Sequence, residues 1–225
     1  MRYMKKNGIF AILLICGSGA LFSFEESWTR FGFEFGNYIE HSVDGTSYTG
    51  APGFNIGIYG FSDNQNIGIF LHYGMLFPVI SDEDWDIGFM QDIIIGPGFR
   101  YSFSDAFKLH FGAGVDWLIG GSSYEKDSIT YRKTVTNLGI AGDVGVKFDI
   151  TDFFYVNAGL TLSCFFLGFE GRSVSERIDN KTFRETQLSD RRIEEFVGFG
   201  IKPYLCVGIN AYSEKSKWGK PPKKS

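Results

Sequence analysis

The sequence is poor in residues that break strands or cross-link them, with 6 prolines and 3 cysteines among 225 residues. Charge is nearly balanced, since the formal net charge at pH 7 is −4, and 44% of the residues are hydrophobic. These values describe one medium-sized folded domain rather than a disordered chain, and we expect no nucleic-acid partner. After residue 23 no stretch of about 18 apolar residues remains, so the rest of the chain can enter a membrane only as strands.

Aromatic residues and glycine are abundant instead. Aromatics reach 17% of the chain, with 24 Phe, and there are 29 Gly. Aromatic rings favour strands, and glycine lets strands bend or approach one another closely. The composition therefore predicts an all-β protein whose strands curve or pack tightly.

The first residues have the pattern of an export signal. Arg2, Lys5 and Lys6 precede an apolar run at 9–15, and small residues continue to residue 23. We expect a cleaved signal peptide at 1–23, a barrel domain at 24–212 and a basic disordered periplasmic tail at 213–225. Cys16 leaves open a lipid anchor, although the bulky Ile15 before it fits such processing poorly.

Apolar and polar residues alternate through most of the remaining chain, with the period of two that only a strand satisfies. Within IGPGFRYSF (95–103) every second residue from Ile95 to Phe103 is apolar, and 107–117 repeats the pattern. Six further segments have the same period, at about 28–39, 53–61, 66–75, 137–150, 153–166 and 196–212. We therefore predict eight strands.

Three similar sequences separate pairs of these strands: GFSDNQ (60–65), SFSDAF (102–107) and DITDFF (149–154). Each places Ser or Thr before an aspartate (Asp63, Asp105 or Asp152), and such side chains bond their own backbone in tight bends. We predict three short hairpin turns at these positions. The other connections, roughly 40–52, 76–91, 120–136 and 168–195, are long and polar. In an up-and-down meander, short turns and long loops then lie at opposite ends.

Three features predict that the apolar strand face points outward into lipid. The strands are about 9 to 14 residues long, which suits a tilted membrane strand better than a soluble strand of roughly five or six. The opposite face mixes glycine with ionisable groups, as a narrow lumen would. Rings gather at the short turns like an interfacial girdle, at Phe61, Phe103, Phe107, Phe148, Phe153 and Phe154. The alternative is a soluble lipocalin-like barrel, which would show the same alternation.

This combination of export signal, alternating strands, short turns and long outer loops resembles the small outer-membrane barrels of the OmpA, OmpX and OmpW kinds. The resemblance covers nearly all of 24–212 and rests on architecture, without a short motif for any subfamily. It implies an eight-stranded antiparallel up-and-down transmembrane β-barrel in a bacterial-type outer membrane, monomeric and surrounded by outer-membrane lipid. One departure is the basic tail, because such barrels usually finish on a strand with a terminal aromatic residue.

The expected lumen is too narrow for a general porin. Eight strands enclose a space that side chains can just fill, and charges in such a space must pair. We predict a salt-bridged plug formed by lumen-facing charges, namely Arg30, Glu34, Arg100, Lys108, Asp143 and Lys147.

The segment 168–195 is the expected working surface, because long loops on a rigid scaffold suit binding. We predict a structural or surface-interaction role, with surface or host molecules bound through five arginines: Arg172, Arg177, Arg184, Arg191 and Arg192. The alternative is an OmpW-like conduit for small hydrophobic molecules, or a narrow channel. Asp92 and Asp116 near the loop end count against an apolar conduit.

No motif points to catalysis. His72 and His110 fall on the lumen face and His41 in the first outer loop, but none has a recognisable nucleophile beside it. The glycines of GIAGDVG (139–145) follow strand spacing rather than that of a nucleotide loop. SDEDWD (81–86) could hold a divalent cation by its carboxylates, yet it lacks the spacing of a calcium loop. We predict no enzymatic activity, no cofactor and no metal site.

Two cysteines remain outside the signal segment. By alternation, Cys164 shares the lipid face and Cys206 the lumen face, and their heights in the barrel differ by about 16 Å at the strand rise. A disulfide needs Cα atoms within about 7 Å, so we predict free thiols.

Overall fold

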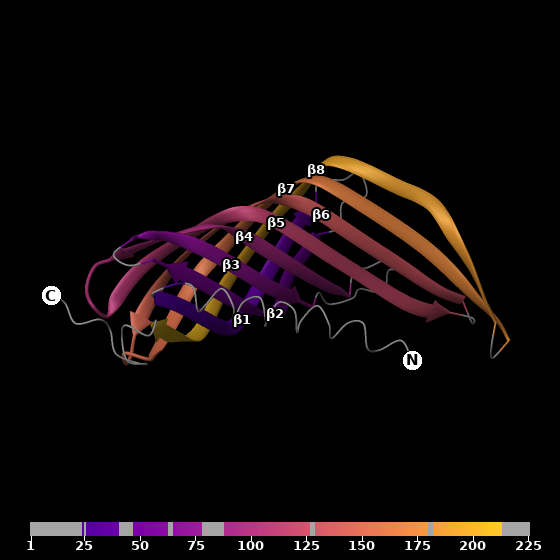
Figure 1. The fold of residues 1–225 in the computed structure, drawn as a ribbon. Helices are drawn as coiled ribbons and strands as arrows, with labels where there is room; N and C mark the ends of the chain where they lie inside the picture. Colours follow the sequence, from indigo (N-terminus) through magenta and orange to yellow (C-terminus); the bar gives the residue numbers. More distant parts are fainter. Residues whose placement is uncertain are drawn as a thin grey trace.

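The computed structural model of the protein describes residues 24, 26–40, 47–62, 65–77, 88–126, 129–179 and 182–212. They form a closed barrel in which each strand pairs antiparallel with the next and β1 pairs with β8, as Figure 1 shows. The strands are β1 Glu26–Glu40, β2 Ser47–Phe61, β3 Ile67–Leu76, β4 Phe89–Ser102, β5 Phe107–Lys126, β6 Ile129–Asp149, β7 Phe154–Asp179 and β8 Thr182–Tyr212. The predicted eight-stranded up-and-down barrel is confirmed.

Short turns join β4 to β5 and β6 to β7, as predicted. The Ser104 hydroxyl accepts a hydrogen bond from the Phe107 amide at 3.0 Å, and the Thr151 hydroxyl accepts one from the Phe154 amide at 2.9 Å. Hydroxyl groups thus satisfy backbone donors that the bends leave unpaired. The third predicted turn connects β2 to β3, but its Asp63 lies outside the described residues.

The opposite end differs from the prediction of long loops. Residues 120–136 lie almost wholly in β5 and β6, which are separated by residues 127–128 alone, and residues 168–195 form the outer parts of β7 and β8, separated by 180–181. In Figure 1, the paired strands β5 and β6 and, still further, β7 and β8 project beyond β1 to β4. The polar composition of these segments does not oppose strand formation, because a hairpin in water needs no apolar face.

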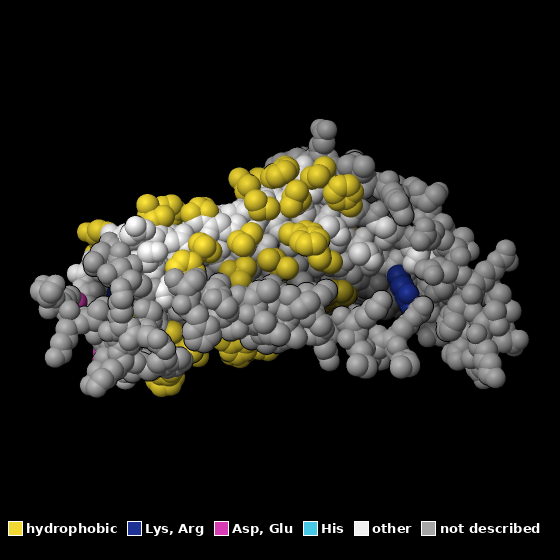
Figure 2. All heavy atoms as spheres, viewed as in Figure 1, with side chains coloured by type: hydrophobic (Ala, Val, Ile, Leu, Met, Phe, Trp, Pro, Cys, Tyr) yellow, Lys and Arg dark blue, Asp and Glu magenta, His cyan; other side chains and the backbone are white. Residues whose placement is uncertain are grey.

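The outer surface of the barrel wall is apolar. Phe33, Val115 and Leu205 are 62%, 52% and 66% exposed, while the lumen-facing Glu34 between Phe33 and Phe35 is fully buried. Figure 2 shows hydrophobic side chains spread over the described wall. A face of this kind is stable only against hydrocarbon, and a closed barrel leaves no unpaired strand edge there. The fold is therefore a transmembrane β-barrel.

The aromatic girdle at the short turns is present with one exception. Phe103, Phe107, Phe148 and Phe154 are exposed, but Phe61 is fully buried and packs on Trp28 inside the lumen, with ring centroids 4.9 Å apart. The placement of Phe61 in the girdle was wrong because Phe54, Ile56 and Ile58 point outward on the same strand, so an odd-numbered position points inward.

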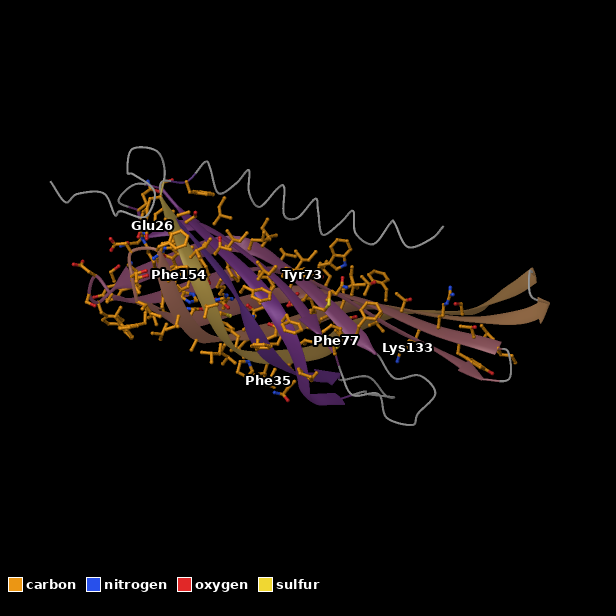
Figure 3. The ribbon with its side chains drawn as sticks, turned by 90° about the horizontal axis from the view of Figure 1, so that it is seen from below. Glu26, Phe35, Tyr73, Phe77, Lys133 and Phe154 are labelled. Atoms are coloured by element: carbon orange, nitrogen blue, oxygen red, sulfur yellow. The ribbon has the colours of Figure 1, made fainter. Side chains whose placement is uncertain are left out.

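Two apolar clusters occupy different heights of the lumen. One lies toward the short turns and consists of Trp28, Tyr59, Phe61, Phe70, Ile94, Ala141 and Tyr155. The other lies toward the extended strands and consists of Ala51, Leu76, Met90, Leu118, Val135 and Phe165. In Figure 3, Glu26 and Phe154 mark the short-turn end, and Lys133 lies toward the extended strands.

None of the described residues belongs to a helix long and apolar enough to cross a membrane. The predicted signal peptide at 1–23 and the predicted tail at 213–225 lie outside the described residues, as do His41 and the acidic segment 81–86. Cys164 and Cys206 are free thiols, as predicted; Cys206 is buried in the lumen and Cys164 is half-buried.

Candidate functional site

Charged side chains near the short turns form the first layer of the lumen. Arg100 on β4 pairs with Glu26 on β1. Lys108 donates to Asp149 at 2.7 Å, and Lys147 pairs with the same carboxylate. The Lys147 ammonium also lies 4.7 Å from the centroid of the Trp28 ring. Arg100 and Lys108 likewise lie over aromatic rings, so each cation in this layer has both an anionic partner and an aromatic face.

Arg30 and Asp143 form the next layer, at the centre of the barrel. Nη2 of Arg30 lies 2.8 Å from Oδ2 of Asp143, and both side chains are almost fully buried. A second bond joins Arg30 Nη1 to Asp143 Oδ1 at 3.2 Å. The pair is thus bidentate, the strongest arrangement for a guanidinium and a carboxylate. It bridges β1 to β6 across the lumen.

Neutral groups complete the hydrogen bonding of this pair. The hydroxyls of Tyr59 and Thr161 donate to Asp143 at 2.5 and 3.0 Å. Arg30 donates to the hydroxyl of Tyr204 at 2.6 Å and to the side-chain oxygen of Asn157 at 3.3 Å. Because strands from opposite walls supply these groups, the network fixes the cross-section of the barrel.

An acidic layer lies above the central pair. Glu34, Asp92 and Asp116 are buried there beside His72, and Asp92 pairs with the buried Lys202. His72 Nε2 lies 3.6 Å from Oε2 of Glu34 and 3.8 Å from Oδ2 of Asp92. Among the described residues, neither the Glu34 nor the Asp116 carboxylate has a partner at hydrogen-bond geometry. This layer is therefore only partly neutralised.

The apolar cluster that lies toward the extended strands, here named the outer apolar cluster, covers the acidic layer. On β4, Met90 is two residues nearer the extended strands than Asp92, and on β5 Leu118 stands in the same relation to Asp116. Leu76 on β3 is two residues beyond Gly74, which pairs with Asp92. These residues and Phe165 are nearly inaccessible to solvent. The lumen is thus closed by apolar packing toward the extended strands and by ion pairs toward the short turns.

The two histidines of the described lumen contact the central pair or the groups that surround it. His110 contacts the Tyr59 hydroxyl at 3.0 Å and the Asn157 amide at 2.7 Å, and His72 contacts Arg30 at 3.4 Å. None of these partners is a serine or cysteine that a histidine could activate.

The six predicted plug residues all face the lumen but do not form one network. Arg30 and Asp143 pair directly. Arg100, Lys108 and Lys147 pair near the short turns with Glu26 or Asp149, and Glu34 belongs to the acidic layer. Alternation was sufficient to place these residues inside.

Partners supplied from other strands were missed. Glu26, Tyr59, Asn157, Lys202 and Tyr204 carry much of the hydrogen bonding. Parity within each strand marked them as lumen residues, since Tyr204 alternates with Leu205 and Lys202 with Ile201. Which of them meet depends on the stagger of the closed barrel, which the sequence does not reveal.

The five arginines proposed for surface binding lie on the outer hairpin, Arg172 and Arg177 on β7 and the others on β8. The register places Glu176 opposite Arg184 and Glu170 opposite Arg192. Their side chains lie outside the described part of the chain, so only their positions along the hairpin are defined.

No protein-family model and no curated protein sequence matches this chain. Similar solved structures include Ail, the attachment invasion locus protein of Yersinia pestis (16% identity, 83% of this chain and 99% of that chain, TM-score 0.48). Neisserial surface protein A (12%, 82% and 95%, 0.47) and the outer membrane protein OprG from Pseudomonas aeruginosa (10%, 84% and 97%, 0.49) are also similar. Because the sequence identities and TM-scores are this low, the fold assignment rests instead on the strand register and the exposed apolar wall of this chain.

Proposed function

We propose that the chain is a non-enzymatic outer-membrane barrel that works through its extended outer hairpins rather than through its lumen. The observation that carries this proposal is the filled interior. Ion pairs, the Arg30–Asp143 pair and the outer apolar cluster occupy successive heights of the barrel. A barrel closed in this way has its accessible polar surface at its two ends.

The outer end has the larger rigid surface. β7 and β8 contain 26 and 31 residues, compared with 10 in β3, so a long part of their hairpin extends past the apolar wall. A hairpin continuous with the barrel presents binding groups with little loss of conformational entropy. Its arginines suit anionic surface or host molecules, because guanidinium binds carboxylate, sulfate and phosphate groups through two parallel hydrogen bonds.

Conductance measurements test the closed lumen. Purified barrel inserted into planar bilayers is expected to give no stable open level, because ions would have to cross both the buried salt bridges and the apolar cluster. Steady conductance of nanosiemens size from the intact chain would contradict the closed lumen.

Binding through the outer hairpin is tested by changing charge while keeping the fold. Replacing Arg172, Arg177, Arg184, Arg191 and Arg192 by glutamine should weaken binding to dextran sulfate, used as a polyanion probe, by at least tenfold, since each arginine supplies charge-assisted bonds. A control in which Glu170, Glu176 and Glu185 become glutamine should bind at least as tightly as the unaltered chain. Equal binding by the arginine-free variant would contradict the proposal.

A second candidate function is passage of small hydrophobic molecules. The observation that favours it is the apolar cluster at the outer end of the lumen, made of Ala51, Leu76, Met90, Leu118, Val135 and Phe165. Asp92 and Asp116 lie directly beneath it, which opposes passage further down. Saturable uptake of a fluorescent hydrocarbon probe that Leu118→Asp abolishes would support this candidate over the first.

A further inference from the structure

The acidic layer carries more negative charge than its own cations balance. Glu34, Asp92 and Asp116 are three buried carboxylates, and Lys202 is the buried cation that interacts with all three. With every group ionised, the layer has a formal charge of −2. The neighbouring Arg30 is already committed to Asp143 by two hydrogen bonds. An uncompensated charge of this size is costly in a sealed, low-dielectric lumen.

Protonation alone leaves the layer poorly satisfied. A neutral carboxylic acid still carries a hydroxyl that must donate and a carbonyl that must accept. Both oxygens of Glu34 and Nε2 of His72 are buried without a partner at hydrogen-bond geometry among the described residues. Unsatisfied buried atoms that face one another are satisfied by a water, an ion or another ligand between them, and of these only a cation also balances the negative charge of the layer.

The unsatisfied atoms converge on one small space. Single ligand atoms of Glu34, His72 and Asp92 all lie within 4.8 Å of one another. Gly74 on β3 lets these atoms approach its backbone closely: a methyl group there would clash with Asp92 Oδ1 and Glu34 Oε1 and lie 3.1 Å from His72 Nε2. In a tetrahedral zinc site the ligand atoms are about 3.4 Å apart. The 3.6 Å from His72 Nε2 to Oε2 of Glu34 is close to that spacing.

We propose that Glu34, His72 and Asp92 bind one divalent transition-metal ion, of which Zn²⁺ is the best match to one imidazole and two carboxylates. A charge of +2 neutralises the layer and ties β1, β3 and β4 together inside the lumen. Lys202 bonds Oδ2 of Asp92, so Oδ1 remains for the metal. Coordination through Nε2 moves the His72 proton to Nδ1, which displaces the 3.4 Å contact from Arg30 and leaves Arg30 its bonds to Asp143.

Titration of the full chain with Zn²⁺ tests this site. Because the lumen is closed, Zn²⁺ is supplied at a series of free concentrations while the urea-unfolded chain refolds in detergent, and the refolded barrel is expected to retain one Zn²⁺ per chain after desalting, with half-occupancy at a micromolar free concentration or lower. The three histidines of the chain supply matched variants. His72→Gln should weaken binding at least tenfold, whereas His110→Gln should leave it within twofold, because His110 is not one of the three clustered residues. His41 lies outside the described residues, and His41→Gln is the control for binding elsewhere in the chain; it too should leave binding within twofold.

Two further variants keep the test decisive if His72→Gln does not fold. Glu34→Gln retains the shape of the side chain and should weaken Zn²⁺ binding at least tenfold, and Gly74→Ala should also weaken it, because the added methyl group displaces Asp92 Oδ1 and Glu34 Oε1. Folding is checked by circular dichroism and trypsin resistance, and Co²⁺ absorption reports nitrogen ligation directly. The proposal is overturned if no saturable binding occurs below about 1 mM, if Glu34→Gln binds as tightly as the unaltered chain, or if His41→Gln alone removes the binding.

Discussion

The central and acidic layers of the lumen both contain buried charged groups, but only the central layer neutralises them completely. At the centre, Arg30 and Asp143 neutralise each other and surrounding hydroxyl and amide groups satisfy their remaining atoms. A few ångströms along the barrel, Glu34 and Asp116 lie near the Asn55 amide and the Ser163 hydroxyl, but their oxygens form no hydrogen bond of normal geometry with them. The first layer is complete within the chain, whereas the second leaves buried carboxylate oxygens without a hydrogen-bond partner among the described residues, which is why we propose a metal ion there. A satisfied buried network stabilises a fold, and an unsatisfied one indicates a ligand.

Breaking the central pair should have the largest effect. Asp143→Asn leaves the Arg30 guanidinium buried without its anion, and loss of one partner of a buried pair costs about 3–5 kcal/mol. Urea unfolding of the barrel in lipid vesicles, followed by tryptophan fluorescence, measures this loss.

The double variant Arg30→Met with Asp143→Leu serves as the control for that measurement. Because neither charge then remains to be desolvated, most of the lost stability should return. A double variant that is as unstable as Asp143→Asn alone would show that the geometry of the pair, rather than charge compensation, holds the centre together.

The acidic layer should respond in the opposite direction. In barrel refolded in the presence of chelator, and at a pH at which Glu34 is ionised, Glu34→Gln removes a buried charge and should raise the free energy of unfolding by about 1–2 kcal/mol. With saturating Zn²⁺ the order should reverse, since only the unaltered chain gains the free energy of metal binding. If Glu34→Gln destabilises the metal-free barrel, the contrast between the two layers is wrong.

The short turns should give the smallest effect. Thr151→Ala removes the hydroxyl that accepts from the Phe154 amide at 2.9 Å, and a single exposed hydrogen bond contributes about 1 kcal/mol. Thr151→Ser, which keeps the hydroxyl, should remain within a few tenths of the unaltered stability in the same unfolding assay.

The number of strands, their direction and the side chains that face the lumen could be predicted from the sequence because they depend on local patterns. Alternation around Phe33, Glu34 and Phe35 fixes which side chains enter the lumen, and the SD and TD pairs mark the bends. Parity alone would also have placed Phe61 inside; the error arose because proximity to a turn was given more weight than its position on β2.

Contacts across the lumen could not be predicted in the same way. Arg30 and Asp143 are 113 residues apart, and they meet because of how eight strands are staggered when the sheet closes. The outer parts of β7 and β8 were missed for a different reason. Hydrophobic alternation identifies strands that contact lipid or a core, and a hairpin in water is under no such constraint.

Side-chain orientation in a bilayer tests the account most directly. A spin label at Val115→Cys, with Cys164 and Cys206 changed to serine, should collide more often with oxygen than with a water-soluble nickel chelate, because Val115 points out of the wall. A label at Ser104→Cys in the short turn should show the reverse. Preferential collision of the Val115 label with the nickel chelate in lipid vesicles would contradict an apolar exterior around a sealed ionic lumen.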